Sequence, residues 1–301
     1  MHRYLQDHKE GNGPVILWVS HPAWARYIYK FNSTLLCYDC TEDFLCFPYS
    51  SVVVQEEVER GDRYLTQYSD LVFVQTQPHL FAKRKLNSNT YVVANAVDYE
   101  LFAKNLVAPE PADLRRIKRP ILAYTGNLDF RANYSLLRQL VSEHPEWSFV
   151  FIGRYNESQY SDLSAFHNVH FLGEKSYPVI PRYLQYIDVC LMLYKDERDI
   201  GWPSPLKLFD YLASGKPIVS TPMSAIRDFS DVILVANRCE EFSHMISLAL
   251  QDSDPRKIAK RIEYARDSSW EVRTRQVWSL IAETLSARHQ AVEEVLCAGM
   301  E

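Results

Sequence analysis

The sequence is poor in glycine and cysteine, and each shortage excludes a class of site. Only nine glycines occur among 301 residues, and none form a G-x-G-x-x-G or a G-x-x-x-x-G-K-[ST] loop. Dinucleotide-binding and P-loop phosphate sites therefore have no motif support. Six scattered cysteines are too few for a disulfide framework, which suits a reducing compartment.

Long apolar runs and an excess of basic residues are also missing. No stretch approaches the roughly 20 apolar residues of a membrane span, and residues 1–10 lack the apolar core of a signal peptide. We therefore expect a cytoplasmic protein. The formal net charge is -5, from 33 basic and 38 acidic residues. Since no positive field would gather nucleic acid on the surface, we expect no nucleic-acid partner.

One pair of cysteines requires a closer look. Cys37 and Cys40 have the C-x-x-C spacing that could supply two ligands of a zinc site or a redox pair. No second C-x-x-C or nearby paired histidine completes a tetrahedral set. Because Cys37 lies in the apolar run 35–38, a buried strand position is the preferred interpretation, and we expect no metal.

The residues that are present alternate between short apolar runs and longer stretches of helical periodicity, which is typical of an α/β protein with parallel sheets. The predicted strands are 15–19, 34–38, 71–74, 91–93, 121–124, 148–152, 169–172, 189–193, 217–219 and 232–235. The predicted helices are 52–69, 133–143, 181–186, 206–213 and most of the chain after 240. This order predicts two Rossmann-like halves in tandem. The polar segment 103–119, with Pro109 and Pro111, predicts the connection between a domain 1–105 and a domain 106–268.

The segment 201–219 is the best candidate for a phosphate site. Ser204 is a candidate N-cap, Pro205 suits the first helical position, and Gly215 can end the helix in a left-handed conformation. Lys207 and Asp210 share one face. A cation in the first turn opposes the helix dipole, which suits a helix at which an anion docks. The alternative is a surface ion pair that contributes a few tenths of a kcal/mol.

The other face of this helix is apolar. Leu206, Phe209 and the pair 212–213 are expected to face the sheet.

Residues 204–217, S-P-L-K-L-F-D-Y-L-A-S-G-K-P, resemble the donor-site signature P-x-K-x-x-E-Y-L-A-x-G-x-P of the group 1 retaining glycosyltransferases. Further segments are similar to that family at 70–74, 95–98, 124–128, 151–153, 168–173, 181–191 and the helix from Trp270. The resemblance implies a GT-B fold, with two Rossmann-like domains facing a cleft. Within it, 1–105 would be a shortened acceptor-side domain, 106–268 the donor domain, and 269–301 a helical tail that crosses back to the first domain.

The resemblance also implies an activity. A sugar, expected to be a hexosyl group, would pass from a UDP- or GDP-linked donor to a hydroxyl of a glycan or lipid-linked acceptor, with retention and without a metal or other cofactor. Such transfer serves polysaccharide or glycoconjugate synthesis. Peripheral contact with the inner face of the membrane is a further expectation, to which the basic runs 83–85 and 115–119 would contribute.

Residue roles follow from the resemblance. Lys207 and the amides around 204–206 would stabilise the departing diphosphate, Arg131 and Arg154 would add contacts to it, and Asp210 would accept hydrogen bonds from the ribose. The expected donor-binding residues are Gly126, Asn127, Arg131, Arg154, Ser204, Pro205, Leu206, Lys207 and Asp210.

The sequence departs from the family pattern in places. Trp202 stands where the family has its first glutamate, so the sugar contact is expected from Asp199 or from backbone. Asn95-Ala96 replaces the common Asn-Gly, and nothing before Pro14 can supply the family's glycine-rich loop. Trp202 and the short N-terminus favour the alternative of a catalytically inactive nucleotide-sugar-binding or scaffold subunit. A GT-B epimerase is a third alternative, without a supporting motif.

The first half contains candidate catalytic carboxylates. Asp39 and Asp43 follow a predicted buried strand, and either could orient the acceptor or assist proton removal from its hydroxyl. The predicted catalytic residues are therefore Asp39, Asp43 and Lys207. An acidic loop with an N-cap is the alternative for the two aspartates. His21 is expected to pack or cap locally.

Overall fold

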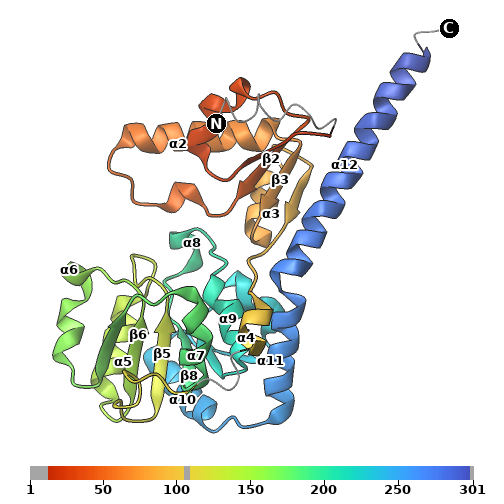
Figure 1. Ribbon diagram of the computed structural model, residues 1–301. Coiled ribbons are helices and arrows are strands. Elements are labelled where there is room, and N and C mark those ends of the chain that lie inside the picture. The colour runs from red at the N-terminus through yellow and green to blue at the C-terminus, as the bar shows by residue number, and fades with distance from the viewer. Residues whose placement is uncertain (1–12, 105–108, 299–301) are drawn as a thin grey trace. The chain divides into compact units, whose positions relative to one another are not determined.

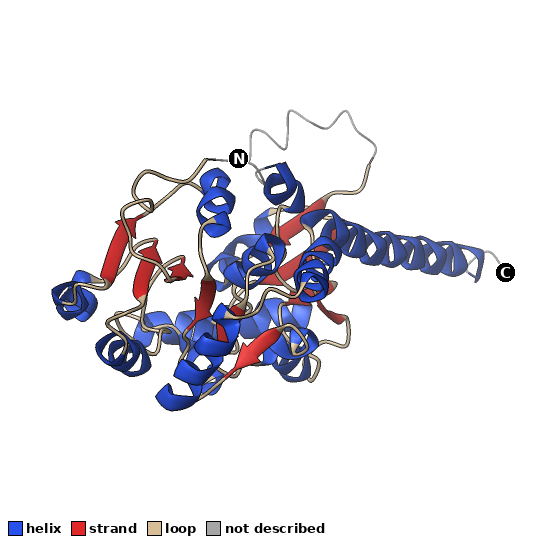
Figure 2. Ribbon diagram, turned by 90° about the horizontal axis from the view of Figure 1, so that it is seen from below, coloured by secondary structure: helices blue, strands red, loops and turns tan. Residues whose placement is uncertain are grey.

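The computed structural model describes residues 13–104 and 109–298, which form two compact units (Figures 1 and 2). Unit 1 contains the described residues up to Val93 together with those from Gln276 onward. Unit 2 contains Ala94–Arg275. Helix α12 (Trp270–Ala298) begins in unit 2 and continues into unit 1.

Unit 1 is built on a parallel sheet with the strand order β1-β2-β3-β4. Its strands are β1 (Ile16–Val19), β2 (Leu35–Cys40), β3 (Leu71–Val74) and β4 (Thr90–Val92). Its helical elements are η1 (Pro22–Lys30), η2 (Phe44–Cys46), α2 (Val52–Tyr68), α3 (Gln77–Lys83) and the later part of α12. The strand side chains alternate between two cores, as period-two strands require.

The two faces of this sheet are covered by different parts of the chain. On one face, Tyr38 and Val72 pack with Val58 and Leu65 of α2. On the other face, Ile281 of α12 packs against residues of β2 and β3. Cys40 belongs to the first core and Cys37 to the second, so the two thiols lie on opposite faces. The buried strand position predicted for Cys37 is confirmed.

The packing of η1 on α2 depends on Gly61. A Cβ atom at Gly61 would lie 2.3 Å from the Pro22 carbonyl oxygen, which is far below van der Waals contact. Glycine inside a helix costs up to about 1 kcal/mol relative to alanine. That cost is offset here because η1 can approach the α2 backbone directly.

Unit 2 contains a six-stranded parallel sheet with the order β10-β9-β8-β5-β6-β7. Its strands are β5 (Ile121–Thr125), β6 (Ser148–Ile152), β7 (Val169–Gly173), β8 (Val189–Met192), β9 (Ile218–Ser220) and β10 (Ile233–Val235). The strand order reverses between β5 and β8, which is the Rossmann arrangement. Ligands of such sheets bind beyond the carboxyl ends of the strands at that reversal.

Helices cover both faces of this sheet. The elements of unit 2 are α4 (Tyr99–Lys104), α5 (Tyr134–Glu143), α6 (Glu157–Tyr160), η3 (Ser161–Ala165), η4 (Tyr177–Val179), α7 (Ile180–Gln185), α8 (Glu197–Ile200), α9 (Leu206–Ser214), η5 (Ser224–Phe229), α10 (Cys239–Leu250), α11 (Pro255–Asp267) and the start of α12. Helices α5 and α10 contribute to one core, and α7, α9 and η5 contribute to the other.

All ten predicted strands are confirmed, with end shifts of a few residues. The predicted helices did not include the shorter elements η1, η2, α3, α4, α6, η3, η4, α8 and η5. The predicted domain boundary also lies too late in the chain. The first unit ends at Val93 rather than at residue 105, because Val97 and Phe102 are buried in a core of unit 2. Leu114, inside the predicted connection, is fully buried in that same core. At the other end the chain returns to unit 1 at Gln276 rather than at 269.

Candidate donor site at the strand-order reversal of unit 2

The loops that follow β5 and β8 meet at the strand-order reversal. Ala132 and Tyr194 form an isolated bridge, and the Lys195 N–H donates to the Arg131 carbonyl oxygen at 2.9 Å. The loop that carries Arg131 is therefore fixed beside the loop that leads into α9.

Two glycine turns open this region. Gly126 follows β5 with φ +91°, and Gly153 follows β6 with φ +148°, both outside the range that side chains favour. A Cβ atom at Gly153 would lie 2.2 Å from the Gly126 carbonyl oxygen. The backbones of the two turns can pack together because Gly153 carries no side chain.

Helix α9 is fixed to the sheet by Tyr211. The Thr125 N–H, at the end of β5, donates to the Tyr211 hydroxyl at 2.8 Å, and both residues are buried. The helix ends at Gly215 with φ +69°, as predicted. Two predictions at its start are wrong. Pro205 rather than Ser204 occupies the N-cap position, and Leu206 is 51% exposed instead of facing the sheet, because Leu208 and Phe209 take the core positions.

Lys207 is a buried cation in the first turn of α9. The residue is only 8% exposed. The Nζ atom lies 3.2 Å from the Tyr124 ring centroid and 5.4 Å from that of Tyr194. Burial holds the pKa of Lys207 well below its ordinary range, opposed by the charge of Asp129. A Cβ atom at Gly126 would lie 3.6 Å from Nζ, so the turn after β5 borders the ammonium group directly.

Asp210 lies one turn further along α9. Its Oδ1 accepts a hydrogen bond from the Tyr177 hydroxyl at 2.9 Å. Burial raises the pKa of Asp210 to about 7, although the Tyr177 hydrogen bond and the charge of Lys207 both act to lower it. The alternative interpretation, a surface ion pair, is therefore wrong, because both residues are buried.

Ser204 presents a buried hydroxyl without a partner. The residue is 6% exposed, and its Oγ finds no hydrogen-bond partner among the described residues. Its carbonyl oxygen accepts a hydrogen bond from Asn95 Nδ2 at 2.6 Å, which fixes the backbone before α9. A buried hydroxyl without a partner costs about 1–3 kcal/mol, so the arrangement favours a ligand that supplies an acceptor.

The two predicted arginines differ in position. Arg131 is partly buried and pairs with Asp129 at 2.8 Å, and its charge acts on Lys207. The side chain of Arg154 is 72% exposed and pairs with Glu174 at 2.8 Å. Asn127 is exposed, and its carbonyl oxygen accepts from the Tyr124 hydroxyl. The structure therefore brings Gly126, Arg131, Lys207 and Asp210 together, but it leaves the Arg154 guanidinium in solvent.

The loop before α9 contains strained backbone. Gly201 has φ +77° and ends α8 in the left-handed region. Trp202 follows with φ +43°, which is costly for a bulky residue. Asp199, expected to replace the missing glutamate, is exposed on α8.

Of the two predicted catalytic carboxylates of unit 1, Asp39 lies within β2 and Asp43 follows that strand. Asp39 is at the end of β2 and accepts from Trp18 Nε1 at 3.2 Å, and burial raises its pKa. Asp43 is the N-cap of η2, as the alternative interpretation held. Its carboxylate lies 3.7 Å from His79 Nε2. Burial alone would raise the pKa of Asp43, but His79 holds it below its usual range.

Sequence analysis missed several residues of these sites. Tyr124 was assigned to the strand core, Tyr177 begins the short helical element η4 and belongs to no motif, and His79 lies on the missed helix α3. For Tyr124, one sequence signal was available: it is an aromatic residue near the carboxyl end of a predicted strand, where ligands bind in this type of sheet.

The chain is similar to known glycosyltransferases. Residues 119–252 match the family described as "Glycosyl transferases group 1". The chain is 27% identical over 222 residues to the Bacillus subtilis (strain 168) protein named "Putative teichuronic acid biosynthesis glycosyltransferase TuaH". That match covers 68% of this chain and 55% of the relative's length.

Solved structures show the GT-B fold. Anabaena Alr3699/HepE in complex with UDP is similar with a TM-score of 0.66 at 15% identity, covering 95% of this chain and 81% of that chain. Sucrose-phosphate synthase from Thermosynechococcus elongatus gives 0.71 at 15% identity, covering 94% and 77% respectively.

Proposed function

We propose that this protein is a glycosyltransferase that uses a nucleoside diphosphate sugar. The match of residues 119–252 to the group 1 glycosyl transferases and the GT-B fold support this proposal. We further propose a hexosyl donor linked to UDP or GDP, a hydroxyl acceptor on a glycan or lipid-linked glycan, and transfer with retention. The corresponding pathway would be polysaccharide or glycoconjugate synthesis. UDP in the HepE complex, and UDP-glucose in another HepE complex, support a nucleotide-sugar donor.

One observation carries the proposal: the buried cation and the unpaired buried hydroxyl at the start of α9. Burial of a charge and of an unpaired hydroxyl both oppose folding. Lys207 and Ser204 nevertheless lie together at the strand-order reversal, beside the free amides of a helix N-terminus. An anion with several acceptor oxygens would satisfy all three groups, and a diphosphate has that chemistry.

These residues would act mainly on the leaving group. As the bond between the sugar and the diphosphate breaks, negative charge grows on the diphosphate. The Lys207 ammonium and the α9 amides would stabilise that charge in a site largely removed from water. Gly126 would leave room for the phosphates beside Lys207, and Arg131 would add positive charge. We propose that no metal or other cofactor is needed for this step.

Asp210 would hold the ribose. Two ribose hydroxyls can donate to an ionised carboxylate, and the Tyr177 hydroxyl already donates to Oδ1. On the acceptor side, Asp39 or Asp43 would orient the acceptor hydroxyl or assist its deprotonation.

The experiment is a donor panel. The full chain is incubated with UDP- and GDP-linked hexoses, and release of the nucleoside diphosphate is measured with and without a membrane-extracted glycolipid acceptor. We expect release from donors of one base, lost in Lys207→Ala. The anomeric configuration of the product, determined by NMR, tests retention. Nucleotide binding without release from any donor would support the inactive binding subunit instead, and this would overturn the proposed activity.

A further inference from the structure

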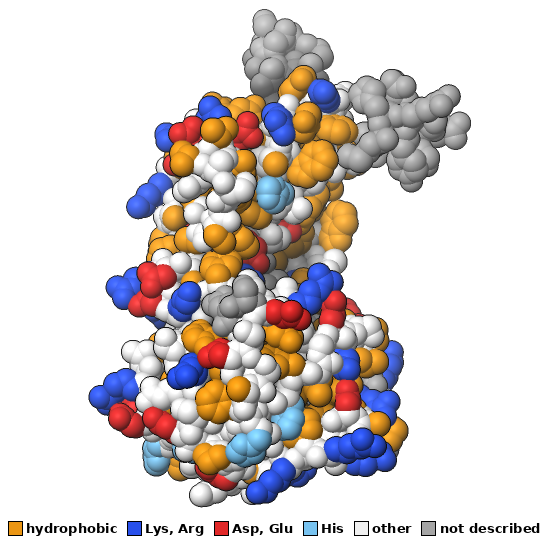
Figure 3. All heavy atoms as spheres, turned by 90° about the vertical axis from the view of Figure 1, so that its left-hand side faces the viewer, with side chains coloured by type: hydrophobic (Ala, Val, Ile, Leu, Met, Phe, Trp, Pro, Cys, Tyr) orange, Lys and Arg blue, Asp and Glu red, His pale blue; other side chains and the backbone are white. Residues whose placement is uncertain are grey.

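Helix η1 of unit 1 displays aromatic rings to solvent. Trp24, Tyr27 and Tyr29 are 54%, 36% and 78% exposed. Exposed aromatic side chains of this size are expensive in water unless a partner covers them. On the surface of unit 1, hydrophobic side chains lie exposed beside Lys and Arg side chains (Figure 3).

Cations lie among these rings. The guanidinium of Arg26 lies 5.1 Å from the Tyr27 centroid, and Lys30 Nζ lies 5.3 Å from Tyr27 and 5.9 Å from Tyr29. We call these five residues, Trp24, Arg26, Tyr27, Tyr29 and Lys30, the aromatic–basic patch. Residues 11–38 contain no aspartate or glutamate, although the whole chain carries a net charge of -5. The patch therefore carries two cations and no carboxylate of its own, although Glu57 and Arg60 of α2 lie beside it.

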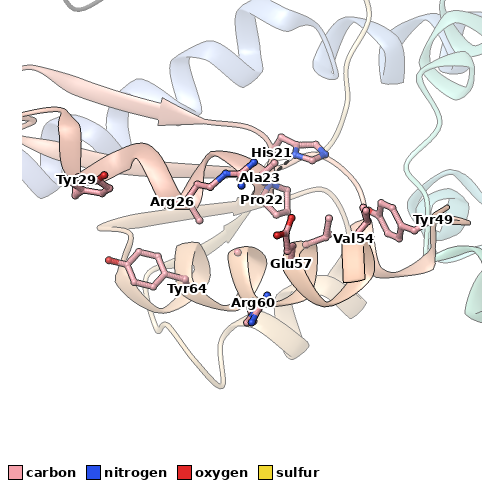
Figure 4. A pocket seen from close by; sticks show the side chains of 13 residues that line it. His21, Pro22, Ala23, Arg26, Tyr29, Tyr49, Val54, Glu57, Arg60 and Tyr64 are labelled. Atoms are coloured by element: carbon pink, nitrogen blue, oxygen red, sulfur yellow. Dashed lines mark hydrogen bonds between the residues drawn. The ribbon is translucent and has the colours of Figure 1, made fainter. Parts of the chain in front are cut away.

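A groove of about 600 Å³ adjoins the patch between η1 and α2 (Figure 4). Arg26 and Tyr29 belong to the aromatic–basic patch and also line the groove. Tyr29 and Tyr64 lie toward one end of the groove, and Tyr49 lies at the other. Pro22, Ala25, Val54, Val58 and Gly61 make much of its lining apolar.

The packing of Gly61 against Pro22 fixes η1 on α2. The patch is thus held on a packed element, and its rings are presented without an ordering step on docking.

The basic runs 83–85 and 115–119, from which the sequence predicted a membrane contact, are less suitable for it than the aromatic–basic patch. Lys83 pairs with Asp62 and is largely buried. In the second run, Arg119 pairs with Asp188 at 2.6 Å, and Arg115 lies 3.9 Å from Glu110. The charges of Lys83, Arg115 and Arg119 therefore already have carboxylate partners within the protein.

We propose that the aromatic–basic patch and the adjoining groove dock unit 1 on the surface of a bilayer that contains anionic lipids. Tryptophan and tyrosine favour the interface between lipid headgroups and hydrocarbon, since each ring joins an apolar body to a polar tip. Arg26 and Lys30 match the negative surface potential of such a bilayer. The apolar lining of the groove accommodates hydrocarbon at the same interface. The charge match favours lipid over a neutral glycan.

The test is co-sedimentation of the full chain with two kinds of vesicle, without nucleotide. One kind contains phosphatidylcholine and phosphatidylglycerol in a ratio of about 3:1, and the other contains phosphatidylcholine alone. We expect binding to the anionic vesicles that weakens about fivefold for each of Arg26→Gln and Lys30→Gln. Trp24→Ala with Tyr29→Ala should weaken it further. Arg63→Gln and Tyr68→Ala, at exposed positions of α2 outside the patch, are the matched controls.

Three results would overturn the proposal. They are no binding to either vesicle, equal binding to both, and equal losses in the patch variants and the controls. A soluble glycan whose binding depends on the patch, with no binding to vesicles, would replace it with a saccharide surface. Nucleotide binding measured on the same variants should stay at the wild-type value, so failure here would be distinct from failure of the proposed donor site.

Discussion

At the scale of single residues, the proposed donor site contains two ionisable side chains that are buried away from water. Lys207 is held against the faces of Tyr124 and Tyr194, and Asp210 is hydrogen-bonded by Tyr177. Both side chains are disfavoured in their charged forms by burial. Perturbed ionisable residues in this kind of position often mark functional sites.

Substitution of Lys207 should therefore separate binding from stability. In Lys207→Met we expect the Kd for the nucleotide to rise about 10- to 100-fold, because a charged hydrogen bond to phosphate contributes about 1.5–3 kcal/mol. The unfolding free energy of the ligand-free protein should stay unchanged or rise, since a buried charge is removed. Calorimetry and urea denaturation measure the two effects. The control is Lys257→Met, an exposed cation on α11. Equal nucleotide affinity in Lys207→Met and wild type would contradict this assignment.

The raised pKa of Asp210 should make the unfolding free energy depend on pH. Its pKa is about 7 in the native protein, against an ordinary value of 3.8. Between these values the native state holds a proton that the unfolded state has released. The unfolding free energy should therefore fall as pH rises from about 4 to about 7, by up to about 4 kcal/mol from this group. Urea denaturation at about pH 5 and about pH 8 should show this slope in wild type and less of it in Asp210→Asn. An equal pH dependence of the unfolding free energy in both proteins would contradict the raised pKa of Asp210.

At the scale of elements, α2 and α3 are joined by a buried charge pair. Both carboxylate oxygens of Asp62 bind Lys83 Nζ, and the Tyr38 hydroxyl donates to Asp62 at 2.8 Å. This network lies in the core between β2 and the two helices.

Replacing only one residue of this charge pair should lower the unfolding free energy more than replacing both. Lys83→Met leaves the Asp62 charge buried without its cation, and we expect a loss of about 3–5 kcal/mol in unfolding free energy. The double variant Asp62→Leu with Lys83→Met should recover most of that loss, because no uncompensated charge remains. Urea denaturation of the three proteins measures both changes. A double variant as unstable as the single one would show that packing dominates.

The same elements show what the sequence could and could not predict. Strands were found because buried parallel strands are continuous apolar runs bounded by polar residues. Helix η1 was missed because its exposed rings follow no core-facing period, and α3 was missed because it is short. The site on α9 was predicted from its motif. The partners of that site, Tyr124 and Tyr177, come from distant segments that only the fold brings together.

At the scale of the whole molecule, α12 belongs to both units and completes the core of the first. Ile281 is 3% exposed and packs on β2 and β3. In the described residues, no helix combines the length and the apolar character needed to span a bilayer.

Damage to α12 should therefore unfold unit 1 and spare the donor site. In Ile281→Asp we expect a lower-temperature calorimetric transition from unit 1, because a charge replaces a buried apolar side chain. Nucleotide affinity should stay within about twofold of wild type, because the proposed donor-site residues all belong to unit 2. Ala282→Asp, at an exposed neighbouring position, is the control. A simultaneous loss of nucleotide binding would mean that the two units fold as one.

The central prediction for this protein is that a nucleotide binds at the start of α9. Calorimetric titration of the full chain with UDP and with GDP is the measurement that decides it. We predict saturable binding of one of them, absent or strongly weakened in both Lys207→Met and Asp210→Asn, each checked for folding. Saturable binding unchanged by both substitutions, or no binding of either nucleotide to the folded wild-type chain, would contradict the proposed donor site.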